Sequence, residues 1–341
     1  MRTSSLTLKE LARRLELSVG TVSMALRGDG RIRAATRERV RAAARAEGYL
    51  PNRAAAELAS KKKQAHFFKI AYLTRTWDWG NGPAIRRQVT VARQRAGEIG
   101  MEFLHTELGA AESWGKVSRR LYRQGVDGIL IGRYKPEETG AIRDGIDWDT
   151  FTSVTLGTEG MQLPLHRVRG GIAHAVATLG NIGREKGYRR IGFAPGRHSD
   201  PIPDDRLRLG QALAFQHDQA GEEGTIPPYV GGMHDADRFL AWVRAHQPDC
   251  VLGFHAGMYK ILKSAFGADP PAFAAMVMTE DAAPDRAIAG MLNPIEEISR
   301  LAVDLLYREL QFHRRGLPEK PFEIVTPFTF REGRSLAALT V

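Results

Sequence analysis

The stretch "LTLKELARRLELSVGTVSMALRGDG", residues 6–30, holds two short segments of helical periodicity that only three residues separate. In the first segment the apolar residues recur at helical spacing and share one face: Leu8, Leu11, Ala12 and Leu15. The intervening "ELS" is too short for a loop between independent elements, and Ser18 is well placed to cap the second helix. This spacing predicts a helix-turn-helix unit.

The second helix and a third one, "TRERVRAAARAEGY" (residues 36–49), complete the unit. Their inward positions are Val22, Ala25 and Leu26, and Val40, Ala43 and Ala44. Ala12 suits the point where the first two helices touch, because only a small side chain fits there. The outer face of the second helix is small and polar, so it contributes little to a core but can enter a major groove.

Positive charge is concentrated in the first fifth of the chain. The formal net charge is +10, and residues 1–63 carry 15 Lys and Arg against 6 Asp and Glu. The other 278 residues hold 34 basic and 33 acidic side chains. This concentration favours a polyanion as the partner of the N-terminal unit. The alternatives are a solvated, charged helical surface and a three-helix bundle used for protein contacts.

Composition indicates a soluble, cytoplasmic protein of two or three domains. The chain has 341 residues, of which 43% are hydrophobic and 26% charged. The sequence contains no run of about 18 apolar residues, the length needed to span a membrane. The first residues have neither the apolar core nor the cleavage site of a signal peptide. Cys250 is the only cysteine, so no intrachain disulfide can form, and its strand-like surroundings predict a buried thiol.

From residue 66 onward, strand-like runs alternate with helical segments. The runs are "FKIAYLT", "MEFLHTEL", "GVDGILIG", "FTSVTLG", "RRIGFAPG", "CVLGFH" and "AAMVMTED". This alternation predicts two parallel sheets with helices on both faces, and ligands bind such folds at the carboxyl ends of the strands. The segment lacks the nucleophile-elbow, phosphate-loop and zinc-protease motifs, and its histidines lack metal-ligand spacing. We therefore expect no enzyme activity, no metal and no cofactor.

The N-terminal sequence resembles the LacI/GalR repressors. The resemblance rests on "TLKELARRLELSVGTVSMALRG" and on "TRERVRAAARAEGYLPNRAAAELAS", which match the family in order, spacing and residue type over nearly all of residues 7–60. One departure is Glu16, because the family usually has Gly or Asn at this turn. A positive φ at a residue with a Cβ costs on the order of 1 kcal/mol, which the turn can tolerate.

The resemblance implies a set of DNA-binding residues. Ser18, Thr21 and Ser23 match phosphate-contacting positions, whereas Val19, Gly20 and Met24 match positions that choose bases. None of these last three side chains forms a strong hydrogen bond, so direct readout would rely on apolar contact, for example with thymine methyl groups. The predicted DNA-binding residues are Ser18, Val19, Gly20, Thr21, Ser23, Met24, Arg27, Asn52, Arg53, Ala55 and Leu58.

The segment "YLPNRAAAELAS" (residues 49–60) matches the hinge helix of the family. A helix of about eight residues with Leu58 as its one large apolar side chain is unstable alone in water. The resemblance implies that two copies fold against each other on the operator, where Leu58 wedges between base pairs of the minor groove and kinks the DNA. The alternative is a flexible linker with helical propensity, which has no need of Leu58 or Pro51.

The remainder resembles the family more weakly, through "IGREKGYRRIGFAPG", "DDRLRLGQALAF", "AGMLNPIEEISRLAVDLLYREL" and "PFTFREGRSL". Together these segments imply a periplasmic-binding-protein-like core of two parallel-sheet subdomains that three crossovers connect. No leucine-heptad tail follows, which favours a homodimer over a tetramer. The expected domains are residues 1–50 (helix-turn-helix), 51–63 (hinge helix and linker), 66–187 with 295–322 (first subdomain) and 188–291 with 323–341 (second subdomain).

The predicted effector site lies between the subdomains. Its expected residues are Trp77, Trp79, Arg208, His255, Glu280 and Asp281. The alternative for Arg208 is a structural ion-pair partner. Phe254-His255 replaces the family's Asn-Asp, and "HRVRGGIAH" lacks the family's carboxylate, which weakens a sugar assignment. Together with Arg75 and Arg197, the site could instead suit an acidic sugar or another anion.

The leading interpretation is a dimeric repressor on a near-palindromic operator, controlled by a small molecule that is a sugar or sugar derivative. An exported solute receptor would need a signal peptide, and an enzyme would need a catalytic constellation. A third possibility is a constitutive regulator whose cleft binds nothing.

Overall fold

The computed structural model describes residues 8–26, 32–46, 68–75, 82–109, 111–199, 201–218, 225–232, 234–280 and 286–339. The chain divides into two compact units, Met1–Phe67 with Gln311–His313, and Phe68–Leu310 with Arg314–Val341. The predicted hinge and linker, residues 51–63, lie outside the described residues.

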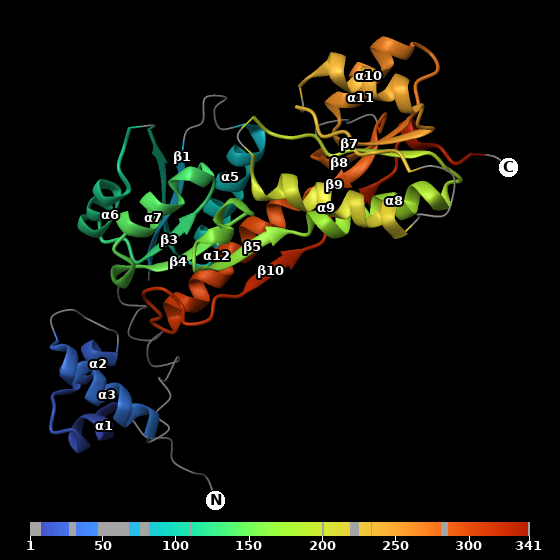
Figure 1. Ribbon diagram of the computed structural model, residues 1–341. Helices are drawn as coiled ribbons and strands as arrows, with labels where there is room; N and C mark the ends of the chain where they lie inside the picture. Colours follow the sequence, from blue (N-terminus) through green and yellow to red (C-terminus); the bar gives the residue numbers. More distant parts are fainter. Residues whose placement is uncertain are drawn as a thin grey trace, which may run out of the picture. The chain divides into compact units, whose positions relative to one another are not determined.

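The first unit contains the three predicted helices, α1 (Leu8–Arg14), α2 (Val19–Leu26) and α3 (Ala34–Ala46) (Figure 1). The small residue at the contact between α1 and α2 is Ala12, which is 2% exposed. The buried side chains form one cluster of the predicted inward positions, which are Leu11, Ala12, Leu15, Val22, Ala25, Val40 and Ala44. The predicted helix-turn-helix core is therefore confirmed, and the polar face of α2 points away from it.

The turn between α1 and α2 ends the first helix with a left-handed residue. Glu16 has φ 55°, as expected from its place in the turn. Its amide donates to the carbonyl of Arg13 at 3.2 Å, and the amide of Leu17 donates to that of Ala12 at 3.0 Å. These two bonds form a Schellman motif, which satisfies carbonyls that a helix end leaves open. The motif fixes the direction in which the chain enters α2.

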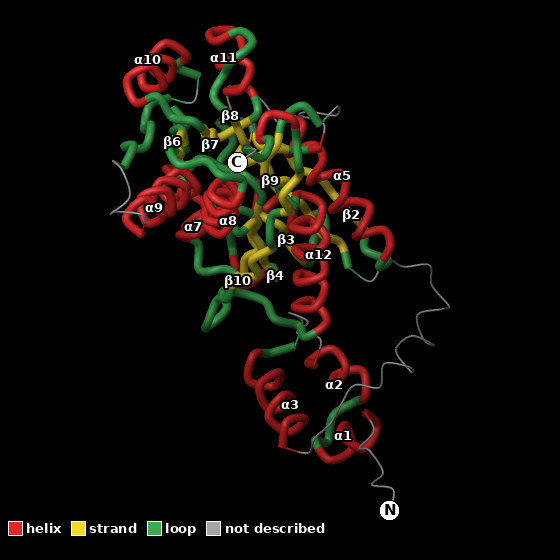
Figure 2. Tube along the Cα trace, turned by 90° about the vertical axis from the view of Figure 1, so that its right-hand side faces the viewer, coloured by secondary structure: helices red, strands yellow, loops and turns green. Residues whose placement is uncertain are grey.

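The first sheet of the core has six parallel strands in the order β10-β5-β4-β3-β1-β2. Alternate residues of β1 face opposite layers, so that Ile70 and Tyr72 pack with α5 and α12, whereas Ala71 and Leu73 pack with α6 and α7. Ion pairs join α5 to α12, which lie beside each other in Figure 2. The elements are β1 (Lys69–Arg75), β2 (Glu102–Leu108), β3 (Gly128–Ile131), β4 (Thr152–Leu156), β5 (His166–Gly170), β10 (Glu323–Thr326), α5 (Pro83–Glu98), α6 (Trp114–Arg123), α7 (Thr139–Gly145) and α12 (Ile295–Gln311).

The second sheet has the order β11-β9-β8-β7-β6, with β11 antiparallel to β9 and the other pairs parallel. Helices α8 and α9 run side by side on one face (Figure 1), and α10 and α11 cover the other. The fold is thus the predicted pair of three-layer α/β subdomains. The elements are β6 (Ile191–Ala194), β7 (Cys250–His255), β8 (Ala272–Met278), β9 (Ala289–Leu292), β11 (Thr329–Arg331), α8 (Ile172–Glu185), α9 (Pro203–Asp218), α10 (Ala236–His246) and α11 (Gly257–Phe266).

The predicted boundaries between the subdomains differ from this arrangement at two places. The first subdomain was expected to run to residue 187, but α8 buries Ile172, Val176 and Leu179 in the core of the second sheet. The second was expected to include residues 323–341, but β10 pairs with β5 in the first sheet. The chain therefore changes sheet after β5, after β9 and after β10, which gives the three expected crossovers at displaced positions.

Cys250 opens β7 and is fully buried among apolar side chains. Burial raises the pKa of its thiol far above the usual range, so it packs as a small hydrophobe, as the sequence predicted. Among the described helices, none combines the length and the apolar character needed to cross a membrane.

Replacing Glu16 by glycine tests the turn. Because Gly adopts positive φ without steric cost, Glu16→Gly is expected to raise the stability of the first unit by about 1 kcal/mol. Ala42→Gly, at an exposed interior position of α3, is the matched control and should lower that stability by about 1 kcal/mol. Hydrogen exchange of the amides of α1–α3 in the full chain measures both. A loss of protection in Glu16→Gly would contradict the assigned turn.

Candidate nucleic-acid interface and ligand site

The N-terminus of α2 is held by Ser18. Its Oγ accepts a hydrogen bond from the amide of Thr21 at 3.0 Å and lies 2.8 Å from the Oγ1 of Thr21. Ser18 is therefore the predicted N-cap. The two hydroxyls hold two protons between them and use one in their mutual bond, so one proton remains to donate to an acceptor such as a phosphate oxygen.

The outward face of α2 contains the remaining predicted residues that the structure describes. Val19 and Gly20 are exposed at its first turn, and Thr21, Ser23 and Met24 are half-buried along its flank. The helix therefore presents an apolar residue and a glycine first, with hydroxyls beside them. Five predicted DNA-binding residues lie outside the described residues, namely Arg27, Asn52, Arg53, Ala55 and Leu58.

In the second subdomain, Arg208 lies on α9 at the carboxyl edge of the sheet. Its side chain is 1% exposed and forms an ion pair with Asp205. Its Nε donates to the carbonyl of Pro195, which follows β6, at 3.1 Å. The guanidinium lies 3.9 Å above the ring of Phe254, near the end of β7. Arg208 therefore joins α9 to the ends of two adjacent strands.

Asp205 is the centre of this cluster. Besides Arg208 it accepts bonds from the Nδ1 of His198 at 2.7 Å and from the amides of His198 and Ile202, at 3.3 and 3.1 Å. Burial raises its pKa, but the bond and charge of His198, the charge of Arg208 and the amide of Ile202 outweigh burial and leave the pKa below its usual value. The carboxylate is therefore ionised, and its stabilising effect is lost only as pH falls below about 4 through this lowered pKa.

The predicted effector residues come together only in part. His255 ends β7, where its Nδ1 accepts from the amide of Gly257 at 3.0 Å and its ring lies 5.5 Å from that of Phe254. Arg208 and His255 thus both contact Phe254. Glu280 follows β8 and is exposed, and its backbone carbonyl accepts from Arg331 at 3.0 Å. Three predicted residues lie outside the described part of the chain: Trp77, Trp79 and Asp281.

Arg75 at the end of β1 holds together the loops at the carboxyl edge of the first sheet. Its Nη1 donates to the carbonyls of Gly109 and Glu112 at 2.5 and 3.0 Å, and its Nη2 lies 2.5 Å from a carboxylate oxygen of Glu138. The guanidinium also lies 5.1 Å from the ring of Trp114. This buried arginine is therefore occupied by protein groups, as Arg208 is, whereas Arg197 is exposed.

A hydrogen bond links the two subdomains at this side. Thr158, buried just after β4, donates to Asp204 in the first turn of α9 at 2.7 Å. Asp204 and Asp205 are consecutive residues. The carboxylate of Asp204 accepts the bond from the first subdomain, and the carboxylate of Asp205 binds Arg208 and His198.

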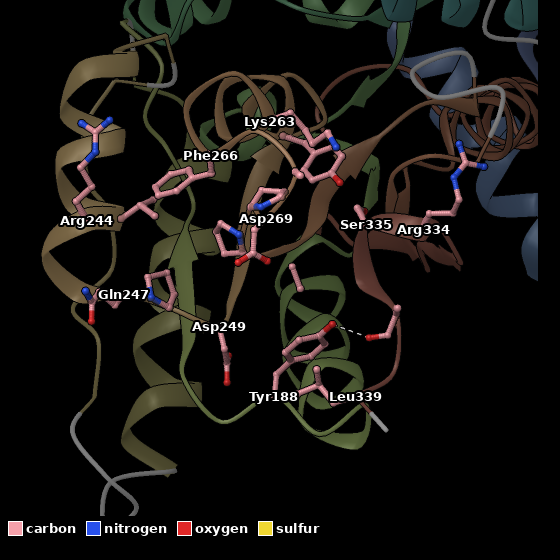
Figure 3. Close-up of a pocket in the computed structure, with 18 residues that line it drawn as sticks. Tyr188, Arg244, Gln247, Asp249, Lys263, Phe266, Asp269, Arg334, Ser335 and Leu339 are labelled. Atoms are coloured by element: carbon pink, nitrogen blue, oxygen red, sulfur yellow. Dashed lines mark hydrogen bonds between the residues drawn. The ribbon is translucent and has the colours of Figure 1, made fainter. Parts of the chain in front are cut away.

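A hollow of about 690 Å³ lies at the opposite, amino edge of the second sheet (Figure 3). Its walls come from the residues that precede β6, β7 and β8 and from Arg334–Ala337. Four of the charged side chains around it are exposed and of both signs, namely Arg244, Lys263, Asp269 and Arg334, and a fifth, Asp249, is half-buried. Because ligands of such folds bind at the carboxyl ends of strands, this hollow lies away from the predicted ligand site.

Sequence reasoning missed Asp205, His198 and Thr158. Asp205 had a usable signal, because an aspartate three residues before Arg208 on a helix faces the same side and can pair with it. His198 lies in a loop and Thr158 follows another strand, so their contacts depend on the tertiary fold.

Comparison with known proteins shows which proteins the N-terminal residues are related to. The profile of the bacterial regulatory proteins of the lacI family matches residues 7–52. The maltose regulon regulatory protein MalI of Vibrio furnissii is 44% identical over 64 residues, which are 19% of this chain and 47% of that protein. The chain thus spans about half the length of the curated relative it matches.

Solved structures share the fold over nearly the whole chain. The lac repressor dimer bound to operator and the anti-inducer ONPF has a TM-score of 0.61 at 17% identity, and covers 98% of this chain and 100% of its own. The complex of the transcriptional regulator CelR with cellobiose has a TM-score of 0.60 at 18% identity, with 97% and 99% covered. A lacI family protein from Silicibacter pomeroyi reaches 0.54 at 21% identity, with 97% and 99% covered.

The N-terminal unit of this chain belongs to the lacI family of bacterial regulatory proteins. The remainder has the two-subdomain fold of the lac repressor. The prediction that the chain is not an enzyme agrees with this match.

Breaking the buried ion pair tests the Arg208 cluster. Asp205→Asn removes the charge that compensates the buried guanidinium and is expected to lower the free energy of unfolding of the core by about 3 kcal/mol. Asp204→Asn is the matched control, because an amide oxygen can still accept from Thr158, and should lower it by less than about 1 kcal/mol. Urea denaturation followed by circular dichroism compares the two, and equal losses would contradict the central place of Asp205.

Proposed function

We propose that this chain is a homodimeric transcriptional repressor that binds a near-palindromic operator and responds to a small molecule bound between its core subdomains. The observation that carries the proposal is the helix-turn-helix unit, whose α2 presents Val19 and Gly20 with half-buried hydroxyls beside them, within a block of net positive charge. Such a helix enters the major groove, and basic side chains around it contact phosphates. A palindromic site follows from the two-fold symmetry of a dimer.

Relatives support the dimer and the class of effector. A lac repressor structure of the same fold is a dimer on its operator, and a regulator from Enterococcus faecium with bound ribose has a TM-score of 0.62 at 16% identity. CelR binds cellobiose. We therefore propose a sugar or sugar derivative, held in the cleft by groups that include His255, Glu280 and the face of Phe254.

The pairing of the arginines bears on the alternative of an anionic metabolite. Arg75 is paired with Glu138 and Arg208 with Asp205. A buried cation that already has a carboxylate partner offers no net charge to a ligand. This favours a neutral effector over an anion. Arg208 then contributes to the ligand site indirectly, by packing against Phe254. A cleft that binds nothing remains the second candidate, because Phe254-His255 stands where polar groups would hold a sugar.

Selection of bound fragments from genomic DNA tests the regulator. The full chain is expected to enrich a short, near-palindromic sequence, since each protomer reads one half-site. The control is a quadruple variant of α2, with Ser18, Val19, Thr21 and Ser23 replaced by alanine, which should enrich nothing. Recovery of fragments without a common sequence by the unaltered chain would contradict the proposal.

The selected operator also tests the proposed hinge. Leu58→Ala is expected to weaken operator binding by about 2–3 kcal/mol, because the kinked duplex loses its wedge, and to leave binding to random DNA little changed. Ser60→Ala, on the same segment but outside the predicted DNA-binding residues, is the control for a change that leaves the wedge in place. Titration of labelled operator and random DNA side by side measures both effects, and equal losses on the two DNAs would exclude the wedge.

A further inference from the structure

The hollow at the amino edge of the second sheet is a feature that the proposed function does not use (Figure 3). Its volume of about 690 Å³ lies within the range of sites that bind small molecules. The hollow opens at the edge of the sheet opposite to the strand ends beside which Arg208 and His255 lie. A molecule bound here would therefore leave the proposed effector site free.

The walls of the hollow are rigid. The hydroxyl of Tyr188 donates to the carbonyl of Ala337 at 2.6 Å, and the Oγ of Ser335 donates to the carbonyl of Phe273 at 2.7 Å. These two bonds hold the C-terminal part of the wall. Three other lining residues are prolines, whose rings fix φ, namely Pro248, Pro270 and Pro271. Walls that are already ordered lose little entropy when a ligand binds, which favours binding.

The end of α11 supplies the hollow with three side chains of different chemistry. Lys263, Phe266 and Asp269 follow one another at intervals of three residues, and all of them line the hollow. The chain turns directly after the helix, where the amide of Asp269 donates to the carbonyl of Phe266 at 3.2 Å. The ring of Phe266 is half-buried and packs against the core of the second subdomain. An ammonium group, an aromatic ring and a carboxylate thus share one wall.

The two charges of this wall have no charged partner in the described part of the chain. Lys263 and Asp269 are both exposed, and neither forms an ion pair with the other or with any further residue that the structure describes. Opposite charges that line one hollow without meeting are complementary to a molecule that carries both. The competing explanation is that both side chains are only solvated, with Lys263 complementing the C-terminus of α11.

We propose that the hollow binds a free amino acid with a large apolar side chain. Its carboxylate pairs with Lys263, its ammonium group pairs with Asp269, and its side chain packs on the ring of Phe266. A ligand with a single charge would leave one of the two charged residues without a partner, and a ligand without an apolar side chain would leave the ring uncovered. This site goes beyond the proposed function, because it requires neither DNA nor the cleft.

Four related compounds separate the three contacts. L-phenylalanine has all three groups, 3-phenylpropionate lacks the ammonium group, phenethylamine lacks the carboxylate, and glycine lacks the ring. The full chain is labelled at its leucine methyl groups, and the NMR shift of the Leu339 methyls, which line the hollow, is followed in each titration. L-phenylalanine is expected to half-saturate this shift at about 1 mM or below. The two singly charged compounds should bind about threefold to fivefold more weakly, and glycine at least about tenfold more weakly.

Two conservative variants assign the charges. Lys263→Gln is expected to bind L-phenylalanine no better than phenethylamine, and Asp269→Asn is expected to bind L-phenylalanine no better than 3-phenylpropionate. Lys260→Gln is the matched control, because Lys260 is exposed on the same helix but does not line the hollow. It should bind all four compounds as the unaltered chain does. Since the three replaced side chains are exposed, the melting temperatures should be unchanged.

Three outcomes overturn the inference. The first is a shift of the Leu339 methyls that does not saturate below about 10 mM L-phenylalanine, including the case in which only other leucine methyls respond. The second is equal affinity for the four compounds. The third is that Lys263→Gln and Asp269→Asn distinguish the compounds as the unaltered chain does. Operator binding is measured separately, so neither result decides the other.

Discussion

The core depends on one constraint, which is that the chain passes three times between two parallel sheets. The crossings follow β5, β9 and β10, and the last consists of only two residues, Pro327 and Phe328. Gly170 at the end of β5 allows this crossing, because a Cβ there would lie 2.6 Å from the ring of Phe328. Three short connections permit the subdomains to rotate relative to each other but prevent them from separating. Motion of this kind is how hinged two-domain proteins close around ligands.

Because the three crossings keep the subdomains together, the contact that α9 makes between them can respond to their relative motion. This helix packs on the second sheet, and its first turn contacts the first subdomain through Asp204 and Thr158. Asp205, the next residue, holds Arg208 and His198 at the carboxyl edge. A ligand that moves Phe254 or His198 therefore acts one residue away from a contact between the subdomains. The helix thus provides a physical route by which events in the cleft could alter the relative position of the subdomains.

The sequence predicted the N-terminal unit better than the core, for a physical reason. Helical periodicity is local, so Leu11, Ala12 and Val22 indicated their partners within a few turns. The positive φ of Glu16 was expected from the resemblance, because the family usually has Gly or Asn at this turn. Strands β5, β9 and β10 were missed. Strands β5 and β10 are short, and their pairing joins residues 156 positions apart, such as Arg167 and Glu323. The displaced boundary at α8 has the same origin, since only tertiary packing tells which sheet a helix covers.

The candidate ligand site shows the limit of reading residues one at a time. In the structure Arg208 and His255 both lie beside Phe254, whereas the predicted Trp77 and Trp79 lie outside the described residues. The sequence left Arg208 open between a ligand anchor and a structural ion-pair partner, and the structure pairs it with Asp205, which changes the chemistry that the cleft offers. Charge compensation depends on which side chains meet, and most of these meet only after folding.

In the proposed function, ligand binding in the core and operator binding by the N-terminal unit are coupled. The most direct measurement is operator affinity of the full chain in the presence of each compound of a sugar library, with thermal stabilisation of the core measured on the same samples. A compound that stabilises the core is expected to change operator affinity by at least about fivefold, and operator DNA is expected to change affinity for that compound by the same factor. A compound that binds the cleft tightly and leaves operator affinity unchanged would contradict this coupling.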